Sequence, residues 1–527
     1  MKKILFLGIL SLFTLSGCSD YLDVNEEQSN NPYSDSLTPN TMLAGALNNY
    51  TNHQIGALAT YGNRMSYVWG LNSGFTSSDP AFTYVFASDS YVAPFENSYL
   101  NADNFQDIID LKIKLPNYEY HYGVSKIFKV MCFDYITALY GDAPYFQALD
   151  EKIAAPKYDD DKKIIPELFK ELDEARAFLT TSNPDVISLG SEDIVFAGDI
   201  DEWIKFLNTV ELKLILRLSK TSDASLVALR TSRAALLDAN KNFISADVTV
   251  NPGYNGSALG QRSPLYRLYG RNELFTDWQS ANRANAAGDY IAKVLNGTQT
   301  NSTITANVVD PRRARMFALV GGAVAGNTQG IFPLTEISRF AGFYIGRSGA
   351  GGVGPNPADV NGMERDAFLM LAAESHFLQA EAFERGLLTG GSAATSFTDG
   401  VNASFNFYST PFGSLTVATL APLNSATYLT AIAGKNGLDY GGSSDKINAI
   451  ITQKYLALAQ WNGIELYLDH MRTGFPVLPL PVGISETTRP NRLIYPNSEY
   501  SNNSANVPNV TAAEIFTVNS KTPYYLQ

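Results

Sequence analysis

The sequence predicts a mainly α-helical protein in which helical hairpins form a scaffold and long irregular loops carry the functional surface. Several segments repeat apolar residues at steps of three to four, as one face of a helix does. Small alanines on these apolar faces let neighbouring helices approach closely. Long tracts rich in Asn, Ser, Thr, Gly and Tyr separate the helical segments, and ordered loops on a rigid scaffold are typically functional surface.

The chain opens with a short export signal. Lys2 and Lys3 precede an apolar run over 4–15, which is too short to span a bilayer because a spanning helix needs about 20 residues. The letters LSGC that end at Cys18 resemble a bacterial lipobox, in which the cysteine receives lipid after cleavage. The sequence therefore predicts a signal peptide over 1–17 and a lipid anchor on Cys18. The alternative is an ordinary signal peptide followed by a chance cysteine.

Five segments carry the helical period, and local signals mark several of their ends. We expect Pro166 in the first turn of its helix, where a missing N–H costs nothing. Asp199 has the position of an N-cap, with Glu202 at capping-box spacing. Gly386 suits the position after a helix end, and Gly463 marks a break between two helices. The five segments span 124–142, 159–179, 198–220, 366–386 and 446–474.

The helices are expected to form tetratricopeptide-like hairpins within a single domain. Ala-Glu pairs at 373–374 and 380–381 are typical of such hairpins, although no clean 34-residue period occurs. No linker divides the chain, so we expect one domain over 18–527, with 18–40 as a flexible N-terminal tether. The irregular tracts lie at about 60–105, 245–285, 320–362 and 389–445, and a tail without a helical period covers 474–527.

Composition excludes several classes of function. The formal charge is −13, or −15 once Lys2 and Lys3 leave with the signal peptide, so the chain is a poor candidate for binding nucleic acid. Four histidines without metal-ligand spacing indicate neither a metal site nor a cofactor. Cys132 lies in a helical segment and is expected to be a buried, inert thiol. Glu374 and Glu381 are expected on a solvated helix face rather than in acid–base catalysis.

Seven segments spread over nearly the whole chain resemble the SusD/RagB family of nutrient-binding outer-membrane lipoproteins, in the order found in that family. The N-terminal half is closer to the SusD-like branch than to the starch-binding archetype. The segments are CSDYLDVN at 18–25, LYGDAPY at 139–145, EWIKFLNTVELKLILRLSK at 202–220, DPRRARMF at 310–317, LAAESHFLQAEAFERG at 371–386, GIELYLDHMRTGFPVL at 463–478 and RPNRLIYPNSEYSNN at 489–503.

The resemblance implies a fold, a partner and a location. It implies a helical fold on four tetratricopeptide-like hairpins, no catalytic activity, and a SusC-like TonB-dependent outer-membrane transporter as the partner. The acidic stretch after Cys18 resembles the signal that sends such lipoproteins to the cell exterior. The implied cargo is an oligosaccharide, and a peptide, as on the RagB side of the family, is the alternative. A surface hydrolase would need a carboxylate pair or a nucleophile in the loops, and the sequence offers none with supporting context.

Two tryptophans in irregular segments are candidates for a sugar-binding surface, because a sugar ring stacks on a flat aromatic face with polar groups at its rim. In 64–75, Trp69 has Tyr67, Asn72 and Phe75 as neighbours. For Trp69 the alternative is a loop tryptophan that packs onto the scaffold.

The second candidate is Trp278, which lies in 275–283 beside Asp277, Gln279 and Arg283. The same alternative of packing onto the scaffold applies to it. Trp203 and Trp461 lie on apolar helical stripes and are expected in the core.

Overall fold

The structure is a computed structural model that describes residues 37–341, 362–409 and 422–527. The signal peptide, Cys18 and nearly all of the expected tether lie outside the described residues. The first helix begins at Pro39, so the end of the expected tether is already helical. Within the described ranges, none of the helices combines the length and the apolar character that a membrane crossing requires.

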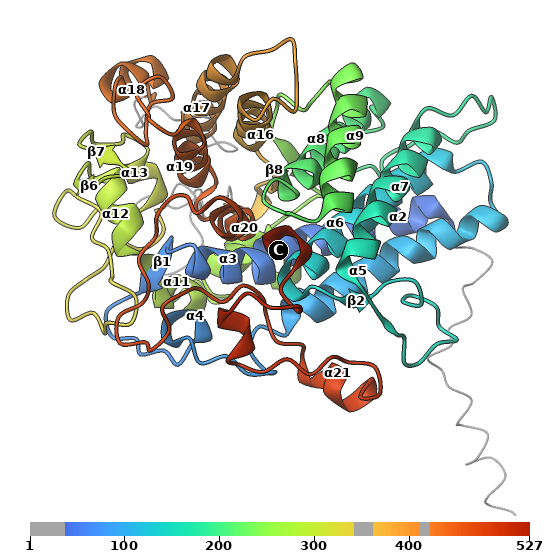
Figure 1. Ribbon diagram of the computed structural model, residues 1–527, viewed down its shortest axis with the longest axis horizontal. Coiled ribbons are helices and arrows are strands. Elements are labelled where there is room, and N and C mark those ends of the chain that lie inside the picture. The colour runs from blue at the N-terminus through green and yellow to red at the C-terminus, as the bar shows by residue number, and fades with distance from the viewer. Residues whose placement is uncertain (1–36, 342–361, 410–421) are drawn as a thin grey trace, which may run out of the picture.

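The long helices pack as successive hairpins around one continuous apolar core (Figure 1). Helix α6 packs against α5 and α7, α8 packs against α9, and α16 packs against α17. A π-helical turn at Gln54–Leu58 joins α2 to α3, and α3 packs against α20. The helices of this scaffold are α2 Pro39–His53, α3 Ala59–Met65, α5 Ala93–Asp110, α6 Glu119–Tyr140, α7 Asp161–Leu179, α8 Ile200–Arg217, α9 Ala224–Ala239, α16 Ala372–Glu384, α17 Ala393–Ser409, α19 Lys446–Leu458 and α20 Gly463–Thr473.

Short helices and strands gather at the end of the molecule drawn on the left of Figure 1, around β1, α11, α12, β6 and β7. The described chain contains four two-stranded antiparallel pairs, β1–β5, β2–β3, β4–β8 and β6–β7. The strands are β1 Trp69–Leu71, β2 Ala143–Pro144, β3 Tyr158–Asp159, β4 Val248–Val250, β5 Asn285–Ala287, β6 Gln299–Thr300, β7 Thr305–Ala306 and β8 Ala367–Met370. The short helices are α4 Pro80–Thr83, α10 Pro264–Tyr269, α11 Ser280–Ala284, α12 Asp289–Leu295, α13 Arg313–Met316, α18 Ser425–Ile432 and α21 Asn497–Asn502.

The helix ends confirm some of the predicted signals and correct others. Asp199 caps α8, since its carboxylate accepts hydrogen bonds from the backbone amides of residues 201 and 202. Gly386 follows α16 with φ +67°, as expected for a residue after a helix end. Pro166 lies inside α7 and not in its first turn, because the helix already begins at Asp161.

Three predicted segment boundaries change. Residues 367–370 form β8, so α16 begins only at Ala372. Parts of three tracts expected to be irregular are helical: α5 in the first, the short α10 and α11 in the second, and α17 in the last. The tail after 474 does lack long helices, and it returns to the core through buried side chains such as Tyr495 and Tyr525.

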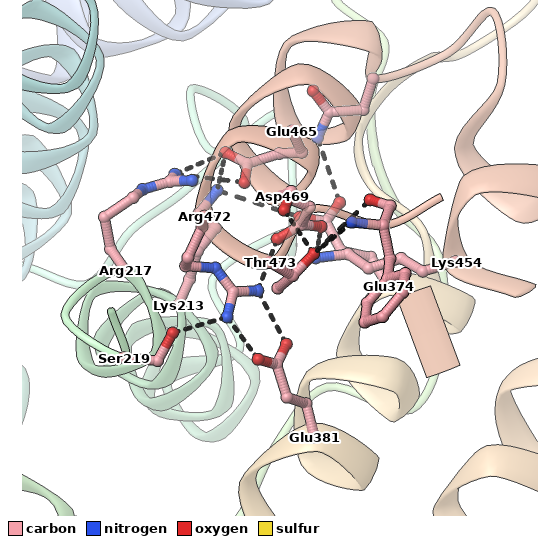
Figure 2. Close-up of polar contacts among 12 residues, drawn as sticks. Lys213, Arg217, Ser219, Glu374, Glu381, Lys454, Glu465, Asp469, Arg472 and Thr473 are labelled. Carbon is pink, nitrogen blue, oxygen red and sulfur yellow. Dashed lines mark hydrogen bonds and ion pairs between the residues drawn. The ribbon is translucent and has the colours of Figure 1, made fainter. Parts of the chain in front are cut away.

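A buried network of charged side chains joins α8, α16, α19 and α20 (Figure 2). Arg217 Nη2 lies 3.0 Å from Glu465 Oε1, and Lys454 Nζ lies 2.8 Å from Asp469 Oδ2. Arg472 pairs with both Glu381 and Asp469. Buried charges of this kind persist only when they are paired, so the network fixes how the four helices pack. Its members are Lys213, Arg217, Glu374, Glu381, Lys454, Glu465, Asp469 and Arg472.

The two glutamates of α16 therefore differ from the sequence prediction, which placed them on a solvated face. Both are fully buried. Burial raises the pKa of Glu374. Burial also acts to raise the pKa of Glu381, but Arg472 outweighs it and the pKa of Glu381 falls to about 2. Both carboxylates stabilise the packing of helices and do not face a ligand.

Candidate functional site

The two loop segments with candidate tryptophans lie side by side, because β1 pairs with β5. Trp69 lies opposite Ala287 in this pair. Beyond the strands, the backbone amide of Asn72 donates to the Ala284 carbonyl at 3.0 Å. The side-chain amide of Asn72 donates to the Arg283 carbonyl at 2.9 Å. Segments that are about 200 residues apart in the sequence thus form one surface region.

Trp69 and Tyr67 are core residues, which corrects the expectation that their rings face a ligand. The Trp69 side chain is 1% exposed. It packs edge-on against Tyr269 and Phe340, with ring centroids 5.6 and 5.3 Å away. Tyr67 is also 1% exposed, so neither ring offers a face on which a sugar can stack. The alternative, in which Trp69 packs onto the scaffold, describes its position.

Asn72 and Phe75 contribute to the loop in different ways. Asn72 is buried and uses its side chain to hold the neighbouring loop and the amide of residue 73. Its role is therefore to position the loop. Phe75 is half-buried and remains available in part to a ligand.

Trp278 is half-buried at the edge of the same region. The Arg271 guanidinium carbon lies 5.3 Å from the centroid of its ring, so the loop holds the indole in a fixed orientation. Asp277 forms a 2.9 Å ion pair with Arg283 and accepts a hydrogen bond from the Trp278 amide. Of the two candidate tryptophans, only Trp278 keeps part of its ring at the surface.

A cleft of 350 Å³ opens beside this region, and we name it the first cleft. Three segments meet there: the stretch from the end of β1 through α4, the turn at 330–332 and the C-terminal segment 482–484. Phe332 is 45% exposed at its rim, and none of its described lining residues carries a charge. The lining residues are Leu71, Thr76, Ser77, Phe82, Thr83, Gly330, Ile331, Phe332, Val482, Gly483 and Ile484.

Sequence reasoning named none of these lining residues as ligand-binding. The apolar run at 331–334 inside a glycine-rich tract and the proline-rich run at 475–481 were the available signals. Neither signal shows that the two runs meet. The backbone amide of Val482 donates to the Gln329 carbonyl at 2.8 Å, and this long-range contact brings them together.

Two larger clefts of 520 and 650 Å³ adjoin each other beside α5 and share Asp103 and Glu151. Burial raises the pKa of Asp103, and nearby carboxylates add to the rise. The acidic lining of these clefts contrasts with the uncharged first cleft.

In the described part of the chain, one set of three carboxylates lies close enough together to hold a metal ion. Its members are Asp142, Asp160 and Asp161. Burial raises the pKa of Asp142, and the nearby Arg492 opposes the rise. Arg492 thus already supplies a positive charge at this cluster.

Cys132 is buried, and burial raises the pKa of its thiol, so this thiol is suited to packing rather than to nucleophilic attack.

Comparison with known proteins decides the family. The profile of a SusD-like family, described as starch-binding and associating with the outer membrane, matches residues 30–496. The chain belongs to the SusD-like family. SusD-like proteins are binding proteins rather than enzymes and associate with the outer membrane. A comparison with curated proteins finds no match.

Solved structures agree with the fold of this SusD-like protein. A SusD homolog from Bacteroides fragilis NCTC 9343 is similar with a TM-score of 0.68 and 21% identity, over 93% of this chain and 99% of that chain. A chitin-binding SusD homolog from Flavobacterium johnsoniae has a TM-score of 0.67 and 21% identity, over 92% and 98%. A further chitin-binding protein has a TM-score of 0.64 and 25% identity, over 88% and 95%. The predicted mainly helical fold is confirmed.

Proposed function

We propose that this protein is a lipid-anchored, cell-surface binding protein that captures an oligosaccharide and delivers it to a SusC-like TonB-dependent transporter. The observation that carries the proposal is the first cleft, which combines an exposed phenyl ring with threonine and serine hydroxyls and has no charge among its described lining residues. A neutral sugar offers an apolar C–H face to the ring and hydroxyls to the polar groups. The family description and the chitin-binding relatives support the same class of ligand.

Trp278 lies outside the lining of the first cleft, in the neighbouring loop, and would add to the binding region from there. Its half-exposed ring lies in the loop that Asn72 holds against the loop after β1. Phe75 and Asp277 lie in the same two loops and would contact the ligand at the rim. In this proposal Trp69 and Asn72 support the surface from below.

The anchor and the transporter rest on the resemblance. Cys18 would carry the lipid, and the partner would receive the ligand. Incorporation of labelled palmitate into the full chain and its loss in Cys18→Ala test the anchor. Co-isolation with a TonB-dependent transporter from solubilised outer membranes tests the partnership, and recovery of the protein without any such transporter would contradict it.

A peptide ligand is the second candidate, because Ile331, Val482 and Ile484 give the cleft an apolar wall that would also fit peptide side chains. Calorimetry of the soluble chain that starts at Ser19 separates the two. Heat on addition of chitin or starch oligosaccharides, with none from a mixed peptide digest, supports the glycan. Heat from the peptide digest alone would show that the ligand is a peptide.

A further inference from the structure

A second cleft of 390 Å³ adjoins the first cleft at Val482. Val482 lines both clefts and is 52% exposed. Its contact with the 329–330 turn is close, since a methyl group at Gly330 would lie 2.1 Å from the Val482 carbonyl oxygen. The two clefts therefore meet at Val482, which forms a ridge between them.

The second cleft has one apolar wall and one polar wall. The segment 477–482 supplies the apolar wall. On the polar wall, Gln299 and Asn301 come from the β6 hairpin, beside Lys293 and Asp289, which neutralise each other at 2.7 Å. Such a cleft fits a neutral ligand with an apolar face and a hydrogen-bonding edge.

The polar wall has unused hydrogen-bonding capacity. The Asn301 side-chain oxygen Oδ1 accepts from the backbone amides of residues 303 and 304, so the side-chain NH₂ group is held as a donor. Within the described part of the chain, neither this amide nor the Gln299 side chain meets a protein partner. These two amides can pair with ligand hydroxyls without first breaking a protein contact.

Tyr67 completes the second cleft from below. Its hydroxyl oxygen accepts from the Gln329 backbone amide at 2.8 Å, and no described residue accepts its proton. Burial raises the pKa of Tyr67 to about 12, so the group remains a donor. A nearly buried hydroxyl proton without an acceptor costs free energy that a ligand oxygen can recover.

We propose that the two clefts form one groove, in which a single neutral oligosaccharide crosses the Val482 ridge and pairs with Tyr67, Gln299 and Asn301 in the second cleft. This inference rests on the proposed function and adds to it the length of the ligand. Short oligosaccharides would fill the first cleft alone, and longer ones would fill both.

The test is calorimetric titration of the soluble chain with chitin and starch oligosaccharides of increasing length. Gln299→Ala and Asn301→Asp remove one donor each, and the second change keeps the acceptor that shapes the turn. Ser302→Ala, at a neighbouring residue that does not line the cleft, is the matched control. We expect affinity to rise with length in the native chain, and each donor variant to bind long ligands about 10-fold more weakly while binding short ligands unchanged. Ser302→Ala should match the native chain at every length.

Three outcomes would overturn the inference. Equal affinity for short and long ligands would show that the second cleft is not used. Unchanged binding of long ligands by both donor variants would show the same, and the proposed function would still stand. Absence of any glycan binding by the native chain would remove the proposed function together with the inference.

Discussion

Gly62 of α3 and Gly463 of α20 bring two helices into backbone contact. A methyl group placed on Gly62 would lie 2.1 Å from the backbone carbonyl carbon of Gly463. One placed on Gly463 would lie 2.4 Å from the backbone nitrogen of Asn63. Helix α20 carries three members of the buried charged network and α3 precedes β1, so this contact joins the network to the helix that leads into β1. The glycines are required here by proximity and not by backbone conformation.

The glycine contact predicts opposite effects for two Gly→Ala changes in neighbouring helices. Gly62→Ala should lower the free energy of unfolding by about 3 kcal/mol, because backbone atoms cannot move aside as a side chain can. At Gly45 in α2, an added methyl group would have no atom within 4 Å. Gly45→Ala should therefore raise the free energy of unfolding by about 0.5–1 kcal/mol, since alanine favours a helix. Urea denaturation measures both, and equal effects would contradict the contact.

Removal of Arg217 should be among the most destabilising single changes. Arg217→Met keeps most of the volume but leaves Asp134 buried without its partner and leaves Glu465 with Lys213 alone at 3.3 Å. We expect a loss of about 3–5 kcal/mol in the free energy of unfolding. Lys170→Met removes an exposed partner of Glu167 and should change it by less than about 0.5 kcal/mol. A small effect of Arg217→Met in the same denaturation assay would argue against a structural role for the network.

The two candidate tryptophans should separate into scaffold and binding roles. Trp69→Ala removes a core ring and should lower the free energy of unfolding by about 3–5 kcal/mol. Trp278→Ala should cost about 1 kcal/mol of stability, mainly from the lost contact with Arg271, and should weaken glycan binding about 10-fold. Thermal melts and calorimetry on both variants check this. Unchanged glycan affinity in Trp278→Ala would show that Trp278 has a structural role and does not contact the ligand.

Asp161 should make stability fall as the pH rises from about 4 to about 7. Burial raises its pKa to about 7, and Asp142 adds to the rise. An unfolded aspartate titrates near pH 3.9, so in this window the folded chain holds a proton that the unfolded chain has lost. By linkage, the contribution of Asp161 to the free energy of unfolding therefore decreases as the pH rises.

Asp161→Asn removes that titration and keeps an acceptor for the Tyr524 amide, which now donates to the carboxylate at 2.7 Å. The stability of the variant relative to the native chain should therefore increase across the window, as measured by denaturation in EDTA. The exposed Asp185→Asn serves as the control and should follow the native curve. Parallel curves of stability against pH for Asp161→Asn and the native chain would contradict the prediction.

The scaffold was predictable where the local pattern and the packing agree. In α8, the apolar stripe and the Asp199 cap both identify the helix, and the structure places Trp203 in the core as expected. Helix α17 was missed because Thr, Ser, Asn and Gly are weak helix formers. Burial of Phe397, Val401 and Phe405 at four-residue steps against α16 stabilises it.

The binding surface was predictable only in part, because it depends on contacts between distant segments. The neighbourhood of Trp69 looks like a loop platform in sequence, but the pairing of β1 with β5 turns its ring onto Tyr269. The exposed ring of the first cleft belongs to Phe332, which only the meeting of two distant runs places there. No local pattern encodes such a meeting.

The most direct test of the account compares glycan binding by Phe332→Ala and Leu334→Ala. Both residues are exposed and lie two positions apart, but only Phe332 lines the first cleft. If this cleft captures a neutral oligosaccharide, calorimetry should show that Phe332→Ala binds about 10-fold more weakly or not at all, while Leu334→Ala binds like the native chain. Equal binding by both variants, or binding of peptides and no glycan by the native chain, would contradict the account.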